Sequence, residues 1–379
     1  MSSSATHERV RVPFVDLTPQ HRAVRAALLE EIGGLIDSGA FTNGPPVAEL
    51  EHAFAAYCGT AECVGLASGL DALRLALLAS DVGPGDEVIV PASTFVATVE
   101  AVSQTGATPV VADVSPVDYC LDPAAVEEAV TGSTRFLLPV HLYGQMADMG
   151  SLHEVAARHG LAVLEDACQA HGADRDGRRA GSCGLAAAFS FYPGKNLRAT
   201  GDAGALTTDD PGLAARVRAL REHGQREKYR HEWVGYTARL DTIQALILLR
   251  KLSYLDEWTA QRRRAAEWYA EALAGVGDIV VPGVPPGSEP VWHLFVVRTA
   301  DPAALGSFLA ERNVSTGRHY PEPVHLTGAY AHLGHVAGDF PVAEQFAREA
   351  LSLPLFPGIT EVQLAAVASA VEDYFDRGR

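Results

Sequence analysis

The chain has 379 residues, of which 47% are hydrophobic and 20% charged, a composition typical of a folded globular protein. Its 47 acidic and 30 basic residues give a formal net charge of −17, which argues against a nucleic-acid or anionic-membrane partner because both need positive potential. No apolar run is long enough for a membrane helix and no secretory signal is recognisable, so a cytoplasmic location is expected. The five cysteines have no paired metal-ligand spacing, so inert buried thiols and no metal site are expected.

From residue 63 to residue 208, short apolar or β-branched runs alternate with segments of helical periodicity. Strands are predicted at 63–66, 87–90, 108–112, 135–140, 161–164, 187–191 and 203–207, and helices at 70–79, 95–104, 123–131 and 151–159. This alternation predicts an α/β fold in which helices flank a mostly parallel mixed sheet.

The pattern changes after about residue 244. One or two long helices are predicted at 243–274, followed by a proline-rich and glycine-rich break, a strand at 292–298 and helices at 302–311 and 361–375. We therefore expect a large domain over residues 10–250 and a smaller C-terminal α+β domain over residues 251–379.

Only three residues are lysines, which limits the candidates for covalent amine chemistry. Lys195 follows an apolar strand and a tight Pro-Gly turn, and another apolar strand follows it, so its side chain is expected at the sheet edge. Lys228 lies in a charged stretch and Lys251 on an arginine-rich helix, and both are predicted to be surface residues.

Three further features lie where strands end. Asp166 ends an apolar strand, and ligands of open α/β sheets bind outside such carboxyl ends, although a turn or helix-cap role is an equal alternative. A Ser-Gly turn at 68–69 opens a helix, whose free N–H groups can bind an anion. Phe95 follows another strand and can present an aromatic face.

Together these features match the requirements of pyridoxal 5'-phosphate (PLP). Lys195 would bond to its aldehyde, and Asp166 would keep its ring nitrogen protonated. The start of the helix at residue 69 and the Ser190 hydroxyl would hold the phosphate, and the ring would stack on Phe95.

From about residue 12 to residue 374 the chain resembles the sugar aminotransferases of the DegT/DnrJ/EryC1/StrS family, within the type I (aspartate-aminotransferase) fold of PLP enzymes. The resemblance is carried by FTNGP at 41–45, SGLDAL at 68–73, GDEV at 85–88, TF at 94–95, EDACQAHG at 165–172, FSFYPGKNL at 189–197, GDAGA at 201–205, GYTARLDTIQA at 235–245 and LSLPL at 351–355.

The resemblance implies roles for the matching positions. Lys195 would carry the cofactor and shuttle protons, Asp166 would pair with the ring nitrogen, and Gln169 would lie near the phenolic oxygen. The phosphate would be held by Ser190 and by the backbone at Gly69 and Leu70. Leu70 and Thr237 depart from the family, which often has Thr and Asn there, so the full set of phosphate contacts differs.

The family also implies a homodimer with shared active sites, because Arg239 would reach into the neighbouring site. A lysine at position 195, where dehydratases of the family have histidine, favours transamination over a lyase reaction. The segments YPGKNL and GDAG resemble the branch that aminates C3 of nucleotide-linked keto sugars, which implies a dTDP-linked 3-keto-deoxyhexose, L-glutamate as donor and a place in amino-sugar and antibiotic biosynthesis.

Substrate contacts are predicted at Tyr192, Arg239, His319, Tyr320 and His325. Arg239 is implied by the resemblance, whereas His319, Tyr320 and His325 belong to a basic and aromatic cluster, with a second such cluster at 226–231. Solvated charge is the alternative for each of them. Two other functions stay open: an aminotransferase for another sugar position or a cyclic ketone, and a non-catalytic sugar-nucleotide-binding or regulatory protein.

Overall fold

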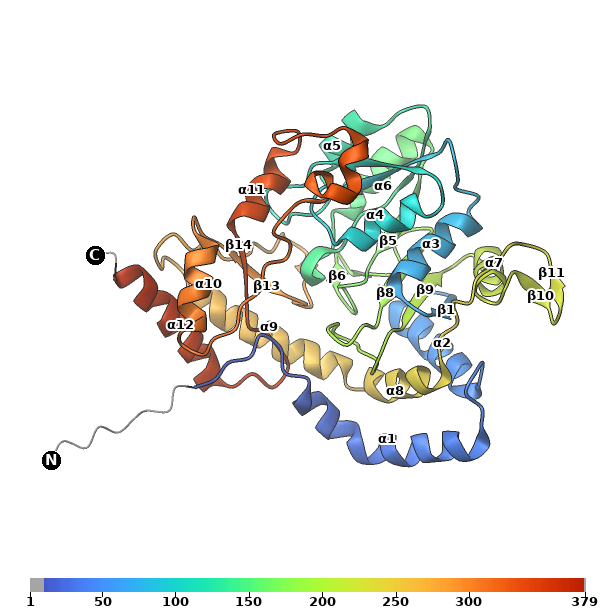
Figure 1. The fold of residues 1–379 in the computed structure, drawn as a ribbon, viewed down its shortest axis with the longest axis horizontal. Coiled ribbons are helices and arrows are strands. Elements are labelled where there is room, and N and C mark those ends of the chain that lie inside the picture. The colour runs from blue at the N-terminus through green and yellow to red at the C-terminus, as the bar shows by residue number, and fades with distance from the viewer. Residues whose placement is uncertain (1–9, 378–379) are drawn as a thin grey trace.

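The computed structural model describes residues 10–377. At its centre is a seven-stranded sheet with strand order β1-β9-β8-β5-β4-β2-β3 (Figure 1). Strand β9 is antiparallel to both of its neighbours, whereas the other pairings are parallel, which confirms the mostly parallel mixed sheet. The strands are β1 (Glu62–Leu66), β2 (Glu87–Pro91), β3 (Thr108–Ala112), β4 (Thr134–Leu137), β5 (Ala162–Asp166), β8 (Ala186–Ser190) and β9 (Gly204–Thr208).

Both faces of this sheet are covered by helices. Because successive strand residues point to opposite faces, Val88 and Val90 enter one core and Ile89 between them enters the other. The first core is completed by α3 (Gly69–Ala79), α4 (Val96–Ser103) and α7 (Pro211–Arg221), and the second by α2 (Pro45–Cys58), α5 (Pro123–Ala129), α6 (Met149–His159) and α8 (Thr242–Leu252).

A third core lies at the left of Figure 1 and is built mainly from the C-terminal part of the chain. Helices α9 (Leu255–Ala272), α10 (Pro302–Ala310) and α12 (Glu361–Asp376) contribute to it with the antiparallel strands β13 (Phe295–Arg298) and β14 (Ala350–Leu353). Val12 is buried in the same core and bridges to Val314, so the N-terminal segment crosses to this part. The predicted division near residue 250 stays a prediction.

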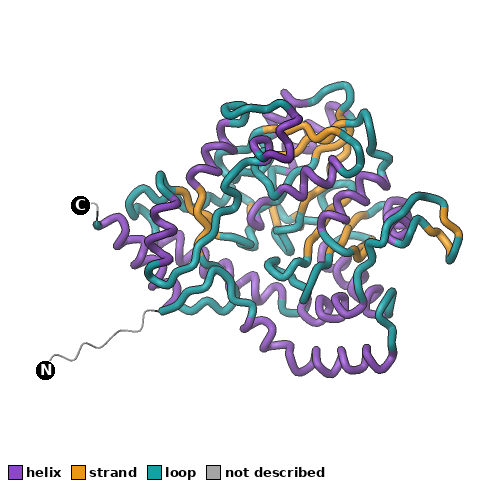
Figure 2. Tube along the Cα trace, viewed as in Figure 1, coloured by secondary structure: helices purple, strands orange, loops and turns teal. Residues whose placement is uncertain are grey.

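Further elements complete the fold around these cores. Helix α1 (Thr18–Ser38) packs on α8, and the hairpin of β10 (Gln225–Glu227) and β11 (Arg230–His231) projects from the body (Figure 2). The short elements are β6 (Asp174–Arg175), β7 (Arg178–Arg179), β12 (Ser288–Glu289), η1 (Leu142–Gly144), η2 (Val324–Leu326), η3 (Gly328–Leu333) and α11 (Pro341–Glu349). Within residues 10–377, no helix combines the length and apolarity needed to cross a membrane.

Candidate active site

The parallel pair β5 and β8 brings the predicted acid and the predicted lysine to one edge of the sheet. Asp166 is the last residue of β5, and Ser190 is the last residue of β8. The loop beyond Ser190 is tied at its base by two backbone bonds, from Phe191 N to Ala203 O (2.8 Å) and from Ala199 N to Phe191 O (2.7 Å). Lys195 therefore projects from a fixed loop.

Asp166 is held by hydrogen bonds on both carboxylate oxygens. Oδ1 accepts from the Cys168 amide at 3.1 Å, and Oδ2 accepts from the Thr98 hydroxyl at 2.7 Å. A second hydroxyl, that of Thr94, lies 2.8 Å from Thr98 Oγ1. All of these groups except Cys168 are buried, so the carboxylate is oriented rather than solvated. The bond from the Cys168 amide is the turn interaction that the alternative describes, while the bond from Thr98 fixes the carboxylate across the sheet edge.

Lys195 lies in surroundings that favour a neutral amine. Burial lowers the pKa of its ammonium group, while the adjacent Cys168 and Asp166 oppose the shift. A lysine with a lowered pKa has more of its amine in the nucleophilic form near neutral pH.

Three histidines, His171, His293 and His319, surround this lysine. The pKa of each is lowered mainly by burial and, to a lesser extent, by the positive charge of Lys195. The pKa of His171, enclosed by Phe54, Phe189 and Phe191, falls to about 3. The imidazoles are therefore neutral at working pH and add no competing positive charge to the pocket.

The first turn of α3 lies where the sequence predicts an anion site. The Ser68 hydroxyl accepts from the Asp71 amide at 3.0 Å, and the Gly69 and Leu70 amides have no acceptor within residues 10–377. A Cβ on Gly69 would lie 2.6 Å from Cys168 Sγ and 2.8 Å from Ser190 Cβ. The helix start thus touches Ser190 directly, and only glycine permits that approach. The Leu70 side chain supplies no donor.

An aromatic wall is built from residues that lie far apart in the sequence. The Phe95 ring, 50% exposed, lies 5.5 Å from the Tyr320 ring, and Gln169 Nε2 donates to the Tyr320 hydroxyl at 3.3 Å. Gln169 Oε1 accepts from the Tyr143 amide at 2.7 Å, and the Tyr143 hydroxyl donates to the His319 carbonyl. Four predicted residues, Phe95, Gln169, His319 and Tyr320, are therefore brought together.

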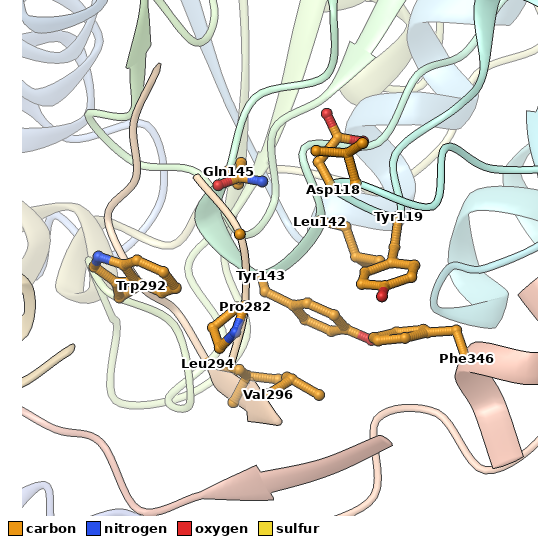
Figure 3. Close-up of a pocket in the computed structure, with 12 residues that line it drawn as sticks. Asp118, Tyr119, Leu142, Tyr143, Gln145, Pro282, Trp292, Leu294, Val296 and Phe346 are labelled. Atoms are coloured by element: carbon orange, nitrogen blue, oxygen red, sulfur yellow. The ribbon is translucent and has the colours of Figure 1, made fainter. Parts of the chain in front are cut away.

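A separate cavity lies on the other side of Tyr143. Figure 3 shows the Tyr119, Tyr143 and Phe346 rings turned toward one another, with the Tyr119 and Phe346 rings stacked 3.7 Å apart. Its lining is mostly apolar and includes neither Lys195 nor Asp166. Tyr143 is the residue that this cavity shares with the aromatic wall.

The other predicted residues lie elsewhere. Tyr192 is 57% exposed on the lysine loop, and its carbonyl accepts from the Lys195 amide at 2.8 Å. Thr237 is exposed beside His223, and Arg239 Nη1 donates to Glu222 Oε1 at 2.9 Å. Within one chain, no contact between the described residues connects Thr237 or Arg239 to Lys195.

His325 is buried, with its Nε2 3.2 Å from Glu344 Oε1 and its ring against Phe340, and its role in binding substrate stays a prediction. The expected surface position of Lys251 requires correction. Lys251 is also fully buried and donates from Nζ to the Arg198 carbonyl at 2.9 Å, so the expected surface position was wrong. Lys228 is exposed as predicted.

Four residues of the site were missed by sequence reasoning: Thr98, Tyr143, His171 and His293. His171 lay within the quoted motif at 165–172 and Thr98 lay one turn beyond Phe95, so local signals existed for both. Tyr143 and His293 reach the site through tertiary contacts, including the bond from His293 N to Tyr143 O at 2.8 Å, and no local pattern indicates them.

An oriented buried acid, an amine of lowered pKa, an aromatic face and a helix N-terminus at one sheet edge fit PLP, and they define the class of PLP-dependent enzymes of fold type I. Comparison with known proteins specifies this class further. The model of the DegT/DnrJ/EryC1/StrS aminotransferase family matches residues 23–372. The chain therefore belongs to this family of aminotransferases.

Several relatives match nearly the whole chain. The dTDP-3-amino-3,4,6-trideoxy-alpha-D-glucose transaminase of Streptomyces venezuelae is 49% identical over 377 residues, covering 100% of this chain and 99% of the relative. The erythromycin biosynthesis sensory transduction protein EryC1 of Saccharopolyspora erythraea is also 49% identical, and the match covers 92% of this chain and 95% of that relative.

Solved structures agree with this assignment. The crystal structure of S. venezuelae DesV in complex with a ketimine intermediate matches with a TM-score of 0.95 and 49% identity, covering 97% of this chain and 99% of DesV. The structure of NtdA from Bacillus subtilis with bound cofactor PMP, the amino form of PLP, matches with a TM-score of 0.91 and 31% identity. This match covers 98% of this chain and 86% of NtdA.

Proposed function

We propose that this aminotransferase uses PLP to transfer an amino group from L-glutamate to C3 of a dTDP-linked 3-keto-deoxyhexose in amino-sugar biosynthesis. The observation that carries the proposal is the juxtaposition of the Lys195 amine with the buried, doubly hydrogen-bonded Asp166 at the ends of β5 and β8. The substrate class rests on the transaminase of S. venezuelae named above and on the lysine-loop sequence.

Each residue has a defined task in this mechanism. When bound, PLP supplies a ring that stabilises negative charge on the carbon that loses a proton. Asp166 would hold the ring nitrogen in its charged form, and Phe95 would cover one ring face. The Gly69 and Leu70 amides and the Ser190 hydroxyl would hold the phosphate. Lys195 would supply the amine that attaches the cofactor and, once released, would act as the base that removes the proton from the α-carbon of the amino donor.

The substrate assignment can be tested by product analysis. Purified protein loaded with PLP is incubated with L-glutamate and a panel of dTDP-linked 3-keto and 4-keto sugars and cyclic ketones, and the products are identified by mass spectrometry. We expect an amino product from 3-keto sugars and none with Lys195→Ala. Amination of only 4-keto sugars or cyclic ketones would overturn the substrate assignment.

The name of the EryC1 relative raises a regulatory role as a second candidate. The geometry favours catalysis, because a protein that only binds sugar nucleotides has no need of an amine with a lowered pKa beside an oriented acid. Absence of amination with every ketone would favour the regulatory candidate.

We also propose a cytoplasmic homodimer in which Thr237 and Arg239 serve the partner's site. In their own chain these residues contact His223 and Glu222, and exposed apolar side chains on α1 and just beyond it, namely Leu29, Ile36 and Phe41, provide a surface for a second copy. Two identical subunits related by a twofold axis would exchange these residues reciprocally.

A mixing experiment tests the shared site. Inactive Lys195→Ala and Arg239→Ala subunits are combined and allowed to exchange, which at random pairing leaves about a quarter of all sites intact. Activity should reappear in the mixture. If exchange is demonstrated and activity stays at the level of the separate variants, Arg239 does not act across an interface.

A further inference from the structure

Three cations are buried together behind the lysine loop. Arg198, on the loop after Lys195, and Lys251, at the end of α8, are both 0% exposed, and Arg262 on α9 is 1% exposed. Lys251 Nζ donates to the Arg198 carbonyl at 2.9 Å. Burial lowers the pKa of Lys251 to about 8 and that of Arg262 well below its usual range, and the charge of Arg198 adds to both shifts. Arg198 is therefore the common neighbour of Lys251 and Arg262.

The guanidinium of Arg198 has no partner within residues 10–377. None of its three nitrogens has a hydrogen-bond acceptor there, and two nitrogens of Arg262, Nε and Nη2, also lack one. The remaining nitrogen of Arg262, Nη1, donates to the carbonyls of Trp292 and Leu355, each at 3.0 Å. Among the described ion pairs, none joins a carboxylate to any of the three cations. Burying an unpaired charge is strongly unfavourable, so the arrangement calls for a counter-charge.

Neighbouring polar groups point to the same conclusion. His21 on α1 has a pKa lowered by burial and by the charges of Lys251 and Arg198, so it adds no positive charge near neutral pH. The preceding Gln20 is 1% exposed and has no partner for either side-chain atom in the described chain. Helix α1 thus brings side chains without hydrogen-bond partners in the described chain, His21 Nε2 among them, to α8, which carries Lys251.

We propose that this cluster of Arg198, Lys251 and Arg262 is a structural binding site for a small inorganic anion, chloride in particular. Because Arg198 is already fully enclosed within one chain, a side chain of a partner subunit would have to displace packed groups to reach it. A nucleotide or a sugar phosphate is too large for such an enclosed position. A monatomic anion accepts hydrogen bonds from several directions, so it can pair with a guanidinium that has no carboxylate partner.

The site would act on the lysine loop, not on the substrate. Arg198 is three residues beyond Lys195, and its charge contributes to lowering the pKa of His171, which borders that lysine. An anion at Arg198 would neutralise part of the positive charge behind the pocket and tie the loop to α8 and α9. The site is independent of the proposed substrate.

The test compares halide with a non-binding anion in the intact PLP-loaded protein. Thermal unfolding is measured in sodium chloride and in sodium gluconate at equal ionic strength and pH. We expect the midpoint in chloride to be higher by roughly 2–4 °C, because a ligand that binds only the folded state stabilises it. Crystals grown in sodium bromide should show an anomalous peak within hydrogen-bond distance of the Arg198 guanidinium.

Matched variants locate the effect. Arg198→Gln should abolish the difference between chloride and gluconate, whereas Arg264→Gln, which alters an exposed arginine on the same helix as Arg262, should retain it. Equal midpoints in both salts and the absence of an anomalous peak would overturn the proposal, as would a full chloride effect in Arg198→Gln. If Arg198→Gln fails to fold, the bromide data on the unaltered protein decide the question.

Discussion

Replacing Asp166 by asparagine removes one negative charge from the site and changes its shape little. The amide oxygen can still accept from the Cys168 amide, as Oδ1 does now at 3.1 Å. The amide nitrogen can donate to Thr98 Oγ1, and the Thr98 hydroxyl can then donate to Thr94, 2.8 Å away. We therefore expect Asp166→Asn to fold and to bind PLP.

The cost of this change follows from the burial of the carboxylate. Asp166 is 6% exposed, so its pairing with a cationic ring nitrogen takes place largely away from water. Removing one partner of a buried charge pair costs about 3–5 kcal/mol, which corresponds to a fall in turnover of roughly 10²–10⁴-fold. The cofactor bond to Lys195 does not depend on this charge and should survive.

The assay measures turnover and cofactor content on the same sample. Bound PLP is followed by its visible absorbance, and kcat is measured with saturating glutamate and the accepted ketone. If Asp166→Asn retains PLP and its kcat stays within about tenfold of the unaltered protein, Asp166 is a structural residue and the assignment of the acid is wrong.

Three further outcomes are expected. In the unfolded chain the histidine pKa is about 6.5, whereas that of His171 is about 3 in the folded protein, so protonation of the unfolded chain lowers stability as pH falls from 6.5 toward 3, by about 2 kcal/mol at pH 5. Denaturant unfolding at pH 7 and pH 5 should therefore show a smaller pH dependence in His171→Phe, and an unchanged dependence would contradict the neutral imidazole. Gly69→Ala places a Cβ 2.6 Å from Cys168 Sγ and should weaken PLP binding to the apoenzyme by about tenfold, whereas Gly34→Ala, with no atom within 4 Å of its Cβ, should bind normally; equal affinities would contradict the close approach. Thr98→Val removes a donor to Asp166 and should lower kcat/KM by about tenfold, whereas Thr98→Ser should keep most of the activity. Equal kcat/KM values in the two variants would exclude a role for the Thr98 hydroxyl.

Much of the sheet could be predicted because its strands are short, apolar and separated by clear turns. The predicted strand at 108–112 coincides with β3, and the strands at 187–191 and 203–207 lie within one residue of β8 and β9. Parallel strands then bring their carboxyl ends together, so Asp166 and Lys195 could be placed at one edge from sequence order alone.

Burial of charged side chains could not be predicted from local pattern. The sequence around Lys251 is rich in arginine and favours a solvated helix face, but α1 packs on α8 and the lysine loop caps its end. The burial of His325 could not be predicted for a similar reason, since its partner Glu344 lies 19 residues further on. His319 and Tyr320 lie beside Gln169 and Tyr143 through contacts between distant segments, which no local pattern could predict.

The central claim is that Lys195 carries the cofactor, and covalent trapping tests it most directly. Borohydride reduction of the PLP-loaded protein should fix the cofactor to one lysine, which peptide mass spectrometry then identifies. Lys251 is buried against the Arg198 carbonyl and Lys228 is exposed in a charged stretch, so neither is placed beside Asp166. We expect the reduced adduct on Lys195 alone. An adduct on Lys228 or Lys251, with Lys195 unmodified, would contradict the assignment of the site.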